Sequence, residues 1–210
     1  MKCDVSLYLV TDSSLCPREQ LPQVVEQALQ GGVTMVQVRE KDCSSRVFYE
    51  TALRVQEVTR RYGVPLIIND RLDVALAVDA DGLHIGQSDL PARVARRILG
   101  EGKLLGVSAG TLEEARQAVA DGADYLGVGA VFPTGTKEDA DAVGVDGLRR
   151  ICADVNVPVV AIGGLKADNL SQLAGTGADG VAVVSAIVGQ RDPRAAAQNL
   201  HRALEGVLDK

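Results

Sequence analysis

Aromatic residues and basic charge are both scarce in this sequence. It has no tryptophan and 3% aromatic residues, and 22 lysines and arginines stand against 28 aspartates and glutamates, so the net charge is -6. An acidic chain with few aromatic side chains and no basic stripe is a poor nucleic-acid binder. The 22 glycines suit the tight packing of an α/β domain better than an aromatic-rich β-sandwich.

Membrane and export signals are missing as well. No apolar run approaches the ~18 residues of a membrane helix, and the first residues lack the pattern of a signal peptide. Four cysteines (Cys3, Cys16, Cys43 and Cys152) are scattered without a CxxC pair. We interpret them as reduced thiols, with Cys152 in the core, and expect a cytoplasmic protein with no membrane or nucleic-acid partner. The sequence predicts no particular oligomeric state.

Short apolar runs alternate with helical stretches along the whole chain. The runs are nearly continuous in hydrophobic residues, as in parallel strands that are covered on both faces. The expected strands are Ser6–Val10, Thr34–Val38, Pro65–Ile68, Gly82–Ile85, Leu104–Val107, Tyr125–Val128, Pro158–Ile162 and Val181–Val184. The expected helices are Leu21–Gln30, Ser44–Tyr62, Leu72–Val78, Pro91–Leu99, Leu112–Ala120, Val145–Asp154, Asp168–Ala174 and Pro193–Leu208.

Eight such pairs predict a single-domain (β/α)8 TIM barrel over residues 1–210, at roughly 26 residues per βα unit. The competing fold is an open doubly wound sheet, but no G-x-G-x-x-G follows the first strand. A recurring turn also favours a regular barrel, because Asp and Gly close three helices just before a strand. It occurs at residues 79–82, 121–124 and 176–180.

Polar residues gather where the strands end, the edge at which such barrels carry their active sites. On the second strand, Gln37, Arg39 and Lys41 share one face because side chains alternate, so Gln37 and Arg39 point into the barrel and Lys41 lies at its mouth. Two cations in a semi-enclosed site are costly without an anion. Either Arg39 forms a structural ion pair with a nearby carboxylate, or the two cations form an anion pocket.

Two aspartates follow neighbouring strands. Asp70 ends the third strand and Asp89 follows the fourth, so their carboxylates can face each other across one rim. Mg²⁺ is usually held by one or two carboxylates with phosphate oxygens and water. Each aspartate also precedes a helix and can be a helix N-cap. Beside Arg39 and Lys41, the pair indicates a metal-assisted diphosphate site.

The remaining strand ends suggest a second phosphate site. Gly163 and Gly164 follow the seventh strand and Ser185 follows the eighth, the position of the phosphate-monoester site in these barrels. Ser108 either donates to a ligand or caps the next helix. The loop at residues 132–139 offers hydroxyls and a lysine to phosphates, as a lid or as an exposed loop. We interpret His84 as a core residue and His201 as a surface residue.

In order and position, these segments resemble the thiamine-phosphate synthase family over nearly the whole chain. The resemblance is carried by Gln37–Lys41, Asn69–Arg71, His84–Asp89, Gly106–Ser108, Gly127–Gly129, Thr134–Lys137, Ile162–Gly164 and Val184–Ser185. It implies a (β/α)8 transferase that joins 4-amino-5-hydroxymethyl-2-methylpyrimidine diphosphate to a thiazole phosphate and releases thiamine phosphate and diphosphate. The implied substitution is dissociative and assisted by Mg²⁺.

The resemblance also assigns residues. The pyrimidine diphosphate is bound by Gln37, Arg39, Lys41, Asn69, Ser108 and Lys137, and the Mg²⁺ by Asp70 and Asp89. Four of these are expected to be catalytic, namely Arg39, Lys41, Ser108 and Lys137. The thiazole phosphate is bound by Thr134, Thr136, Gly164, Val184 and Ser185. The substrate-binding set is completed by Val38, Glu40 and Gly135.

Three other functions suit the same barrel. A thiazole tautomerase related to this family needs no diphosphate or metal, which leaves the cations and aspartates without a role. A phosphate-ligand sensor binds without turnover and needs no Mg²⁺. A lyase or isomerase needs a Lys or carboxylate base inside the barrel, but Lys103 begins the fifth strand, at the wrong end for that role.

Overall fold

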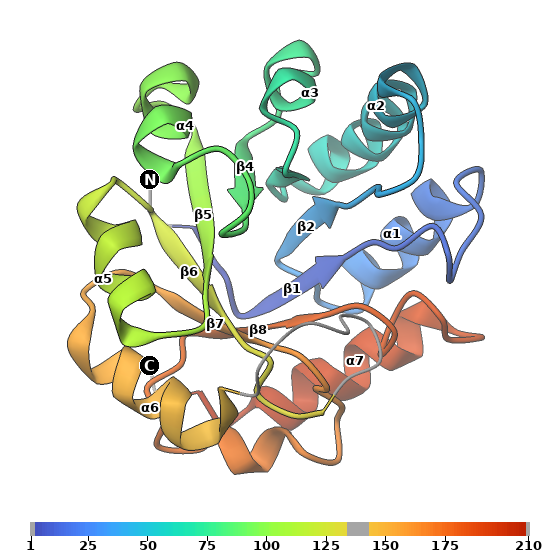
Figure 1. Ribbon diagram of the computed structural model, residues 1–210. Coiled ribbons are helices and arrows are strands. Elements are labelled where there is room, and N and C mark those ends of the chain that lie inside the picture. Colours follow the sequence, from blue (N-terminus) through green and yellow to red (C-terminus); the bar gives the residue numbers. More distant parts are fainter. Residues whose placement is uncertain (1–2, 134–142, 209–210) are drawn as a thin grey trace.

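A computed structural model of the chain describes residues 3–133 and 143–208. Its strands form one closed barrel in sequence order, and every neighbouring pair is parallel. Helices surround the barrel on the outside (Figure 1). The strands are β1 (Leu7–Val10), β2 (Met35–Val38), β3 (Leu66–Asn69), β4 (Gly82–Ile85), β5 (Leu104–Ala109), β6 (Tyr125–Val128), β7 (Val159–Ile162) and β8 (Gly180–Val183). The predicted (β/α)8 barrel is confirmed.

The outer layer follows the predicted helices closely, except over 168–174 and at the last helix, which ends at Leu204 and not at Leu208. Its α-helices are α1 (Leu21–Gln30), α2 (Ser45–Tyr62), α3 (Leu72–Ala77), α4 (Ala92–Leu99), α5 (Leu112–Ala120), α6 (Gly144–Asp154) and α7 (Pro193–Leu204). The helix predicted over 168–174 is instead a short 3₁₀ helix, η1 (Leu170–Leu173). Its two buried leucines are three residues apart, the spacing of a 3₁₀ turn, and Gly175 with a φ of 67° follows at once.

Side chains cap three helices of the outer layer at their N-termini. Ser44, Thr111 and Asp192 accept backbone N–H bonds at the starts of α2, α5 and α7. Asp70 does not cap α3, whose N-cap is Arg71 without a side-chain bond. The Asp70 carboxylate is therefore left for another role.

The recurring aspartates have a specific function in the barrel. The last aspartate of each turn (Asp81, Asp124 and Asp179) lies just before a strand and accepts a hydrogen bond from the backbone of the preceding strand. A threonine does the same before β2, so the four strand pairs β1–β2, β3–β4, β5–β6 and β7–β8 carry one clamp each. The bonds are Leu7 N–H to Thr34 Oγ1 (3.1 Å), Leu66 N–H to Asp81 Oδ2 (2.8 Å), Leu105 N–H to Asp124 Oδ2 (2.7 Å) and Val159 N–H to Asp179 Oδ2 (2.8 Å).

Hydrophobic residues form two separate clusters. The larger one fills the space between strands and helices, and half-buried Cys152 packs against it. Burial raises the pKa of the Cys152 thiol to about 11, and all four cysteines are unpaired. The smaller cluster lies inside the barrel around Tyr8, Met35 and Tyr125. In the part of the chain that is described, no helix combines the length and the apolar character needed to cross a membrane.

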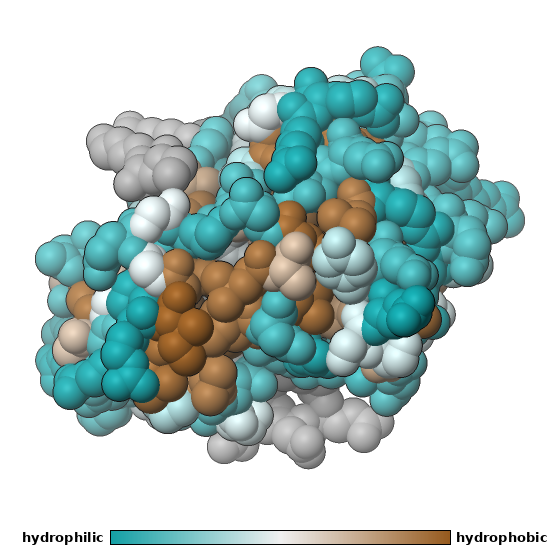
Figure 2. Space-filling view, turned by 90° about the horizontal axis from the view of Figure 1, so that it is seen from above, coloured by the Kyte–Doolittle hydropathy of each residue, from teal (hydrophilic) through white to brown (hydrophobic). Residues whose placement is uncertain are grey.

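The outer face over α2, α3 and α4 carries an apolar area. Seen from above, hydrophobic residues gather there within a mostly hydrophilic surface (Figure 2). Exposed large hydrophobic side chains in this part of the chain are Tyr49, Tyr62, Leu76, Leu90 and Ile98. Since these helices cover the outside of the barrel, the apolar area is separate from the barrel mouth.

The clamps predict a measurable loss of stability when one is removed. Asp179→Ala deprives the Val159 N–H of its charged acceptor, and a hydrogen bond to a charged group contributes about 1.5–3 kcal/mol. We expect the free energy of unfolding in urea to fall by this amount. Asp168→Ala removes the same charge from an exposed side chain and is the control, with an expected change of about 0.5 kcal/mol or less. Equal losses in the two variants would contradict the clamp.

Candidate active site

Side chains from β2 converge on the mouth of the barrel as the alternation predicts. Gln37 is buried inside the barrel, and its amide Nε2 donates to the Tyr8 hydroxyl at 2.7 Å. Two residues further along, on the same face, Arg39 Nη1 lies 3.1 Å from Asp12 Oδ2, which belongs to the loop after β1. The ion pair that was one of the two alternatives for Arg39 is therefore present. Both partners keep part of their surface exposed, 20% for the Arg39 side chain and 13% for Asp12.

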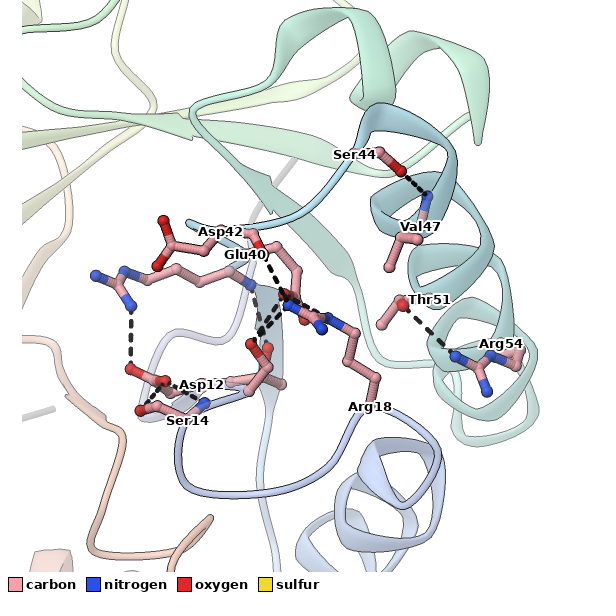
Figure 3. A network of polar contacts seen from close by, with 12 residues as sticks. Asp12, Ser14, Arg18, Glu40, Asp42, Ser44, Val47, Thr51 and Arg54 are labelled. Atoms are coloured by element: carbon pink, nitrogen blue, oxygen red, sulfur yellow. Dashed lines mark hydrogen bonds and ion pairs between the residues drawn. The ribbon is translucent and has the colours of Figure 1, made fainter.

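Val38 and Glu40 point the opposite way. Val38 packs in the cluster beneath the helices. The Glu40 side chain is fully buried, and its Oε2 accepts from Ser13 Oγ at 2.9 Å and faces Arg18 Nη2 at 2.8 Å (Figure 3). Glu40 Oε1 has no hydrogen-bond partner among the described residues. The Glu40 carboxylate thus ties the loop after β1 to the loop after β2.

Asp70 and Asp89 meet at the rim beside Lys41. Lys41 Nζ lies 2.6 Å from Asp70 Oδ2, and Asp89 Oδ2 accepts from the Gly86 N–H at 2.7 Å. Burial and then the neighbouring Asp70 raise the pKa of the Asp89 carboxyl, while the Gly86 N–H and the Lys41 charge act against that rise. Asp70 adopts a φ of 61°, in the left-handed region that few residues other than glycine occupy. Such conformations cluster at functional sites.

This pair fits a magnesium ion. Two negative charges held side by side are relieved by a cation between them. Among the described residues no group of three or more His, Cys, Asp or Glu side chains is arranged for a metal. Two carboxylates suffice for Mg²⁺, which keeps several waters and takes further oxygens from substrate phosphates.

Asn69 and Ser108 complete this side of the mouth. The register pairs Asn69 with His84, and both side chains point inward. Asn69 is buried, and its side-chain amide bonds to no described residue. Ser108 Oγ lies 3.0 Å from His84 Nε2 and is partly accessible. Both are placed to contact a ligand at the mouth.

The far side of the mouth presents backbone donors. Gly163 and Gly164 after β7 have φ values of 101° and 67°, and a Cβ on Gly164 would lie 2.6 Å from the Pro133 carbonyl oxygen. Ile187 and Val188 donate to the Val184 carbonyl, which forms a single helical turn after β8. Among the residues that the structure covers, none accepts a hydrogen bond from the N–H of Gly164, Ser185 or Ala186. Unpaired N–H groups of this kind bind phosphates.

Four predicted site residues lie outside the described residues: Thr134, Gly135, Thr136 and Lys137. Lys103 is described, and its Nζ bonds to Asp79 Oδ1 and the Ala80 carbonyl at the opposite end of the barrel. This placement agrees with the argument against a lysine base inside the barrel.

Sequence reasoning missed several residues of the site. His84 is buried, as the sequence predicts, and only its contact with Ser108 at the mouth was missed. Alternation on β4 signals its inward direction, because Leu83 and Ile85 belong to the outer cluster. Asp12 and Arg18 carry no such signal, since they lie in a loop whose path depends on the whole barrel.

Comparisons with known proteins agree with this geometry. A family model described as thiamine monophosphate synthase matches residues 7–187. Thiamine-phosphate synthases of Ruminiclostridium cellulolyticum and Clostridium beijerinckii are 56% and 53% identical over 199 residues, and each alignment covers 95% of both chains. The solved structure of thiamine phosphate pyrophosphorylase from Pyrococcus furiosus is 43% identical, with a TM-score of 0.91 and 98% of each chain covered.

The buried carboxylate of Glu40 predicts a strong coupling with Arg18. Arg18→Leu leaves Glu40 without its cation, and breaking a buried pair costs about 3–5 kcal/mol. Arg18→Leu/Glu40→Leu removes both charges and should recover most of that free energy of unfolding in urea. A double variant no more stable than Arg18→Leu would show that the ion pair is not what holds the two loops.

Proposed function

Since the chain belongs to the thiamine monophosphate synthase family, we propose how this transferase uses its barrel mouth. Its substrates are 4-amino-5-hydroxymethyl-2-methylpyrimidine diphosphate and 4-methyl-5-(2-phosphooxyethyl)thiazole. The first binds over β2 to β5 and the second over β7 and β8. The products are thiamine phosphate and diphosphate.

One observation carries this proposal. Two carboxylates and Lys41 occupy one side of the mouth, and unpaired backbone N–H groups after β7 and β8 occupy the other. The first set suits a diphosphate with a divalent cation, and the second suits a phosphate monoester. A tautomerase that handles the thiazole phosphate alone has no use for the first set.

The proposed reaction needs no general base. The bond between the pyrimidine methylene carbon and the diphosphate oxygen breaks, and the electron pair leaves with the diphosphate. The aminopyrimidine ring stabilises the methylene cation, and the lone pair of the thiazole nitrogen then forms the new carbon–nitrogen bond. Charge stabilisation at the leaving group is therefore the main catalytic demand.

The chain's own residues meet that demand. Asp70 and Asp89 would hold a Mg²⁺, which when bound neutralises diphosphate charge as a Lewis acid. Lys41, Arg39 and Lys137 add positive charge around the leaving group. The Arg39–Asp12 pair is accessible, so the guanidinium can exchange its carboxylate for a phosphate. Asn69 and Ser108 orient the pyrimidine.

The proposal limits the expected partners to these small molecules, without nucleic acid or membrane. A cytoplasmic location remains a prediction, in keeping with four unpaired thiols.

A direct assay tests the reaction. Both substrates are mixed with the purified enzyme, with and without Mg²⁺, and thiamine phosphate and diphosphate are quantified. We expect equal amounts of both products and a strict requirement for the metal. Failure to form thiamine phosphate with Mg²⁺ present would refute the proposed reaction.

Asp89→Ala tests the metal assignment. Loss of one of two carboxylates should abolish Mg²⁺-dependent turnover while the circular dichroism spectrum stays unchanged. Glu101→Gln removes a negative charge from an exposed residue at the opposite end of the barrel and is the control. Full activity of Asp89→Ala at any Mg²⁺ concentration would remove Asp89 from the metal site.

Lys137→Ala tests the leaving-group role of the lysine. Removing one group that stabilises developing charge should lower kcat by about 10²-fold or more, with little change in the KM for the thiazole phosphate. Single-turnover measurement of diphosphate release gives the affected step. If the thiazole affinity alone changed, the lysine would belong to the other phosphate site.

A further inference from the structure

An unbroken chain of polar side chains crosses the inside of the barrel. Gln37 Nε2 donates to the Tyr8 hydroxyl at 2.7 Å, and that hydroxyl lies 2.9 Å from the Tyr125 hydroxyl. Tyr125 lies 3.1 Å from His84 Nδ1, and His84 Nε2 lies 3.0 Å from Ser108 Oγ. We call these five residues the relay. It links strands β1, β2, β4, β5 and β6.

The barrel is built around the relay. Four of its five residues are buried, including His84 with 9% of its surface exposed, and Ser108 at the mouth is partly accessible. Two glycines on β5 and β6 clear the space for the rings. A Cβ on Gly106 would lie 2.1 Å from Tyr125 Cζ, and one on Gly127 would lie 3.0 Å from His84 Cε1. A dry barrel interior is usually filled with Val, Ile and Leu, so a fully connected polar chain here is a specific feature.

Counting the available hydrogen atoms identifies the donor and the acceptor in each hydrogen bond of the relay. An amide nitrogen can only donate, so the Tyr8 oxygen accepts from Gln37 and the Tyr8 hydrogen is left for Tyr125. Tyr125 in turn gives its own hydrogen to His84 Nδ1. Burial raises the pKa of both tyrosines well above the ordinary value, so each phenol keeps its hydrogen at neutral pH.

The last hydrogen bond of the relay, between His84 and Ser108, lies at the mouth of the barrel. With Nδ1 accepting, the neutral ring of His84 carries its hydrogen on Nε2 and donates it to Ser108 Oγ. The Ser108 hydrogen then has no acceptor within the relay and points to the mouth. A doubly protonated His84 would reverse the Tyr125 bond and leave the Tyr8 hydrogen without an acceptor among the described residues.

We propose that His84 is a positioning residue, which the relay from Gln37 holds in the Nε2–H form so that Ser108 donates a hydrogen bond to the substrate. The ligand group at this point is a hydrogen-bond acceptor, such as a ring nitrogen without hydrogen or a phosphate oxygen. The inference rests on the proposed function for its placement of the pyrimidine substrate next to Ser108. The form of the His84 ring does not depend on that placement.

Nitrogen-15 NMR of the ligand-free enzyme tests the form of the ring. The chain has two histidines, so His201→Gln, a change at an exposed residue, leaves a single labelled ring. We expect Nε2 to show the shift and coupling of a protonated nitrogen and Nδ1 those of an acceptor. A hydrogen on Nδ1, alone or together with one on Nε2, would overturn the proposal, because Ser108 would then not be left as an outward donor by this chain of bonds.

A double-mutant cycle tests whether His84 acts through Ser108. We expect His84→Asn, whose shorter amide does not reach Ser108, and Ser108→Ala each to lower kcat about tenfold, the effect of one hydrogen bond. The double variant should lose no more than Ser108→Ala alone. His84→Gln, which keeps an N–H near the Nε2 position, should recover most of the activity. Losses that multiply in the double variant would overturn the positioning role.

The two tests separate the possible failures. Absence of thiamine phosphate formation with an Nε2–H ring would refute the proposed function and leave the direction of the relay intact. Normal catalysis with an Nδ1–H ring would refute the relay and leave the proposed function intact.

Discussion

The repulsion between two carboxylates held side by side is the constraint on which the site depends. Asp70 and Asp89 come from adjacent turns, after β3 and after β4, and a closed parallel barrel brings those turns to one rim. Lys41 offsets part of the charge, yet burial and the neighbouring Asp70 keep the pKa of Asp89 raised. A rim with this charge balance is suited to a divalent cation and a polyanion. The loop contacts around it, such as Arg18 with Glu40, keep the cationic strand end in place.

The two ends of the barrel have different roles, one in stability and the other in the candidate site. At the end where the strands begin, one clamp per strand pair fixes the backbone. At the other end, side chains of the same strands point to the mouth. The polar interior connects Gln37, inside the barrel, to Ser108 at the mouth, so the orientation of one hydroxyl depends on residues from several strands.

Periodicity accounts for what the sequence predicted well. All eight strands lie where apolar runs predict them, and alternation placed Gln37 and Arg39 on the inner face. The 3₁₀ turn at Leu170–Leu173 was taken for a helix, because two leucines three residues apart fit both patterns. The relay was missed, because it depends on distances between strands that one-dimensional patterns do not contain.

Diffraction from crystals grown with thiamine phosphate, diphosphate and Mn²⁺ in place of Mg²⁺ tests the central claim most directly. The account predicts one anomalous peak between the carboxylates of Asp70 and Asp89, with the diphosphate on Lys41 and the product phosphate on the N–H groups after β7 and β8. Both anions on the same side of the mouth, or a metal away from these two aspartates, would contradict it.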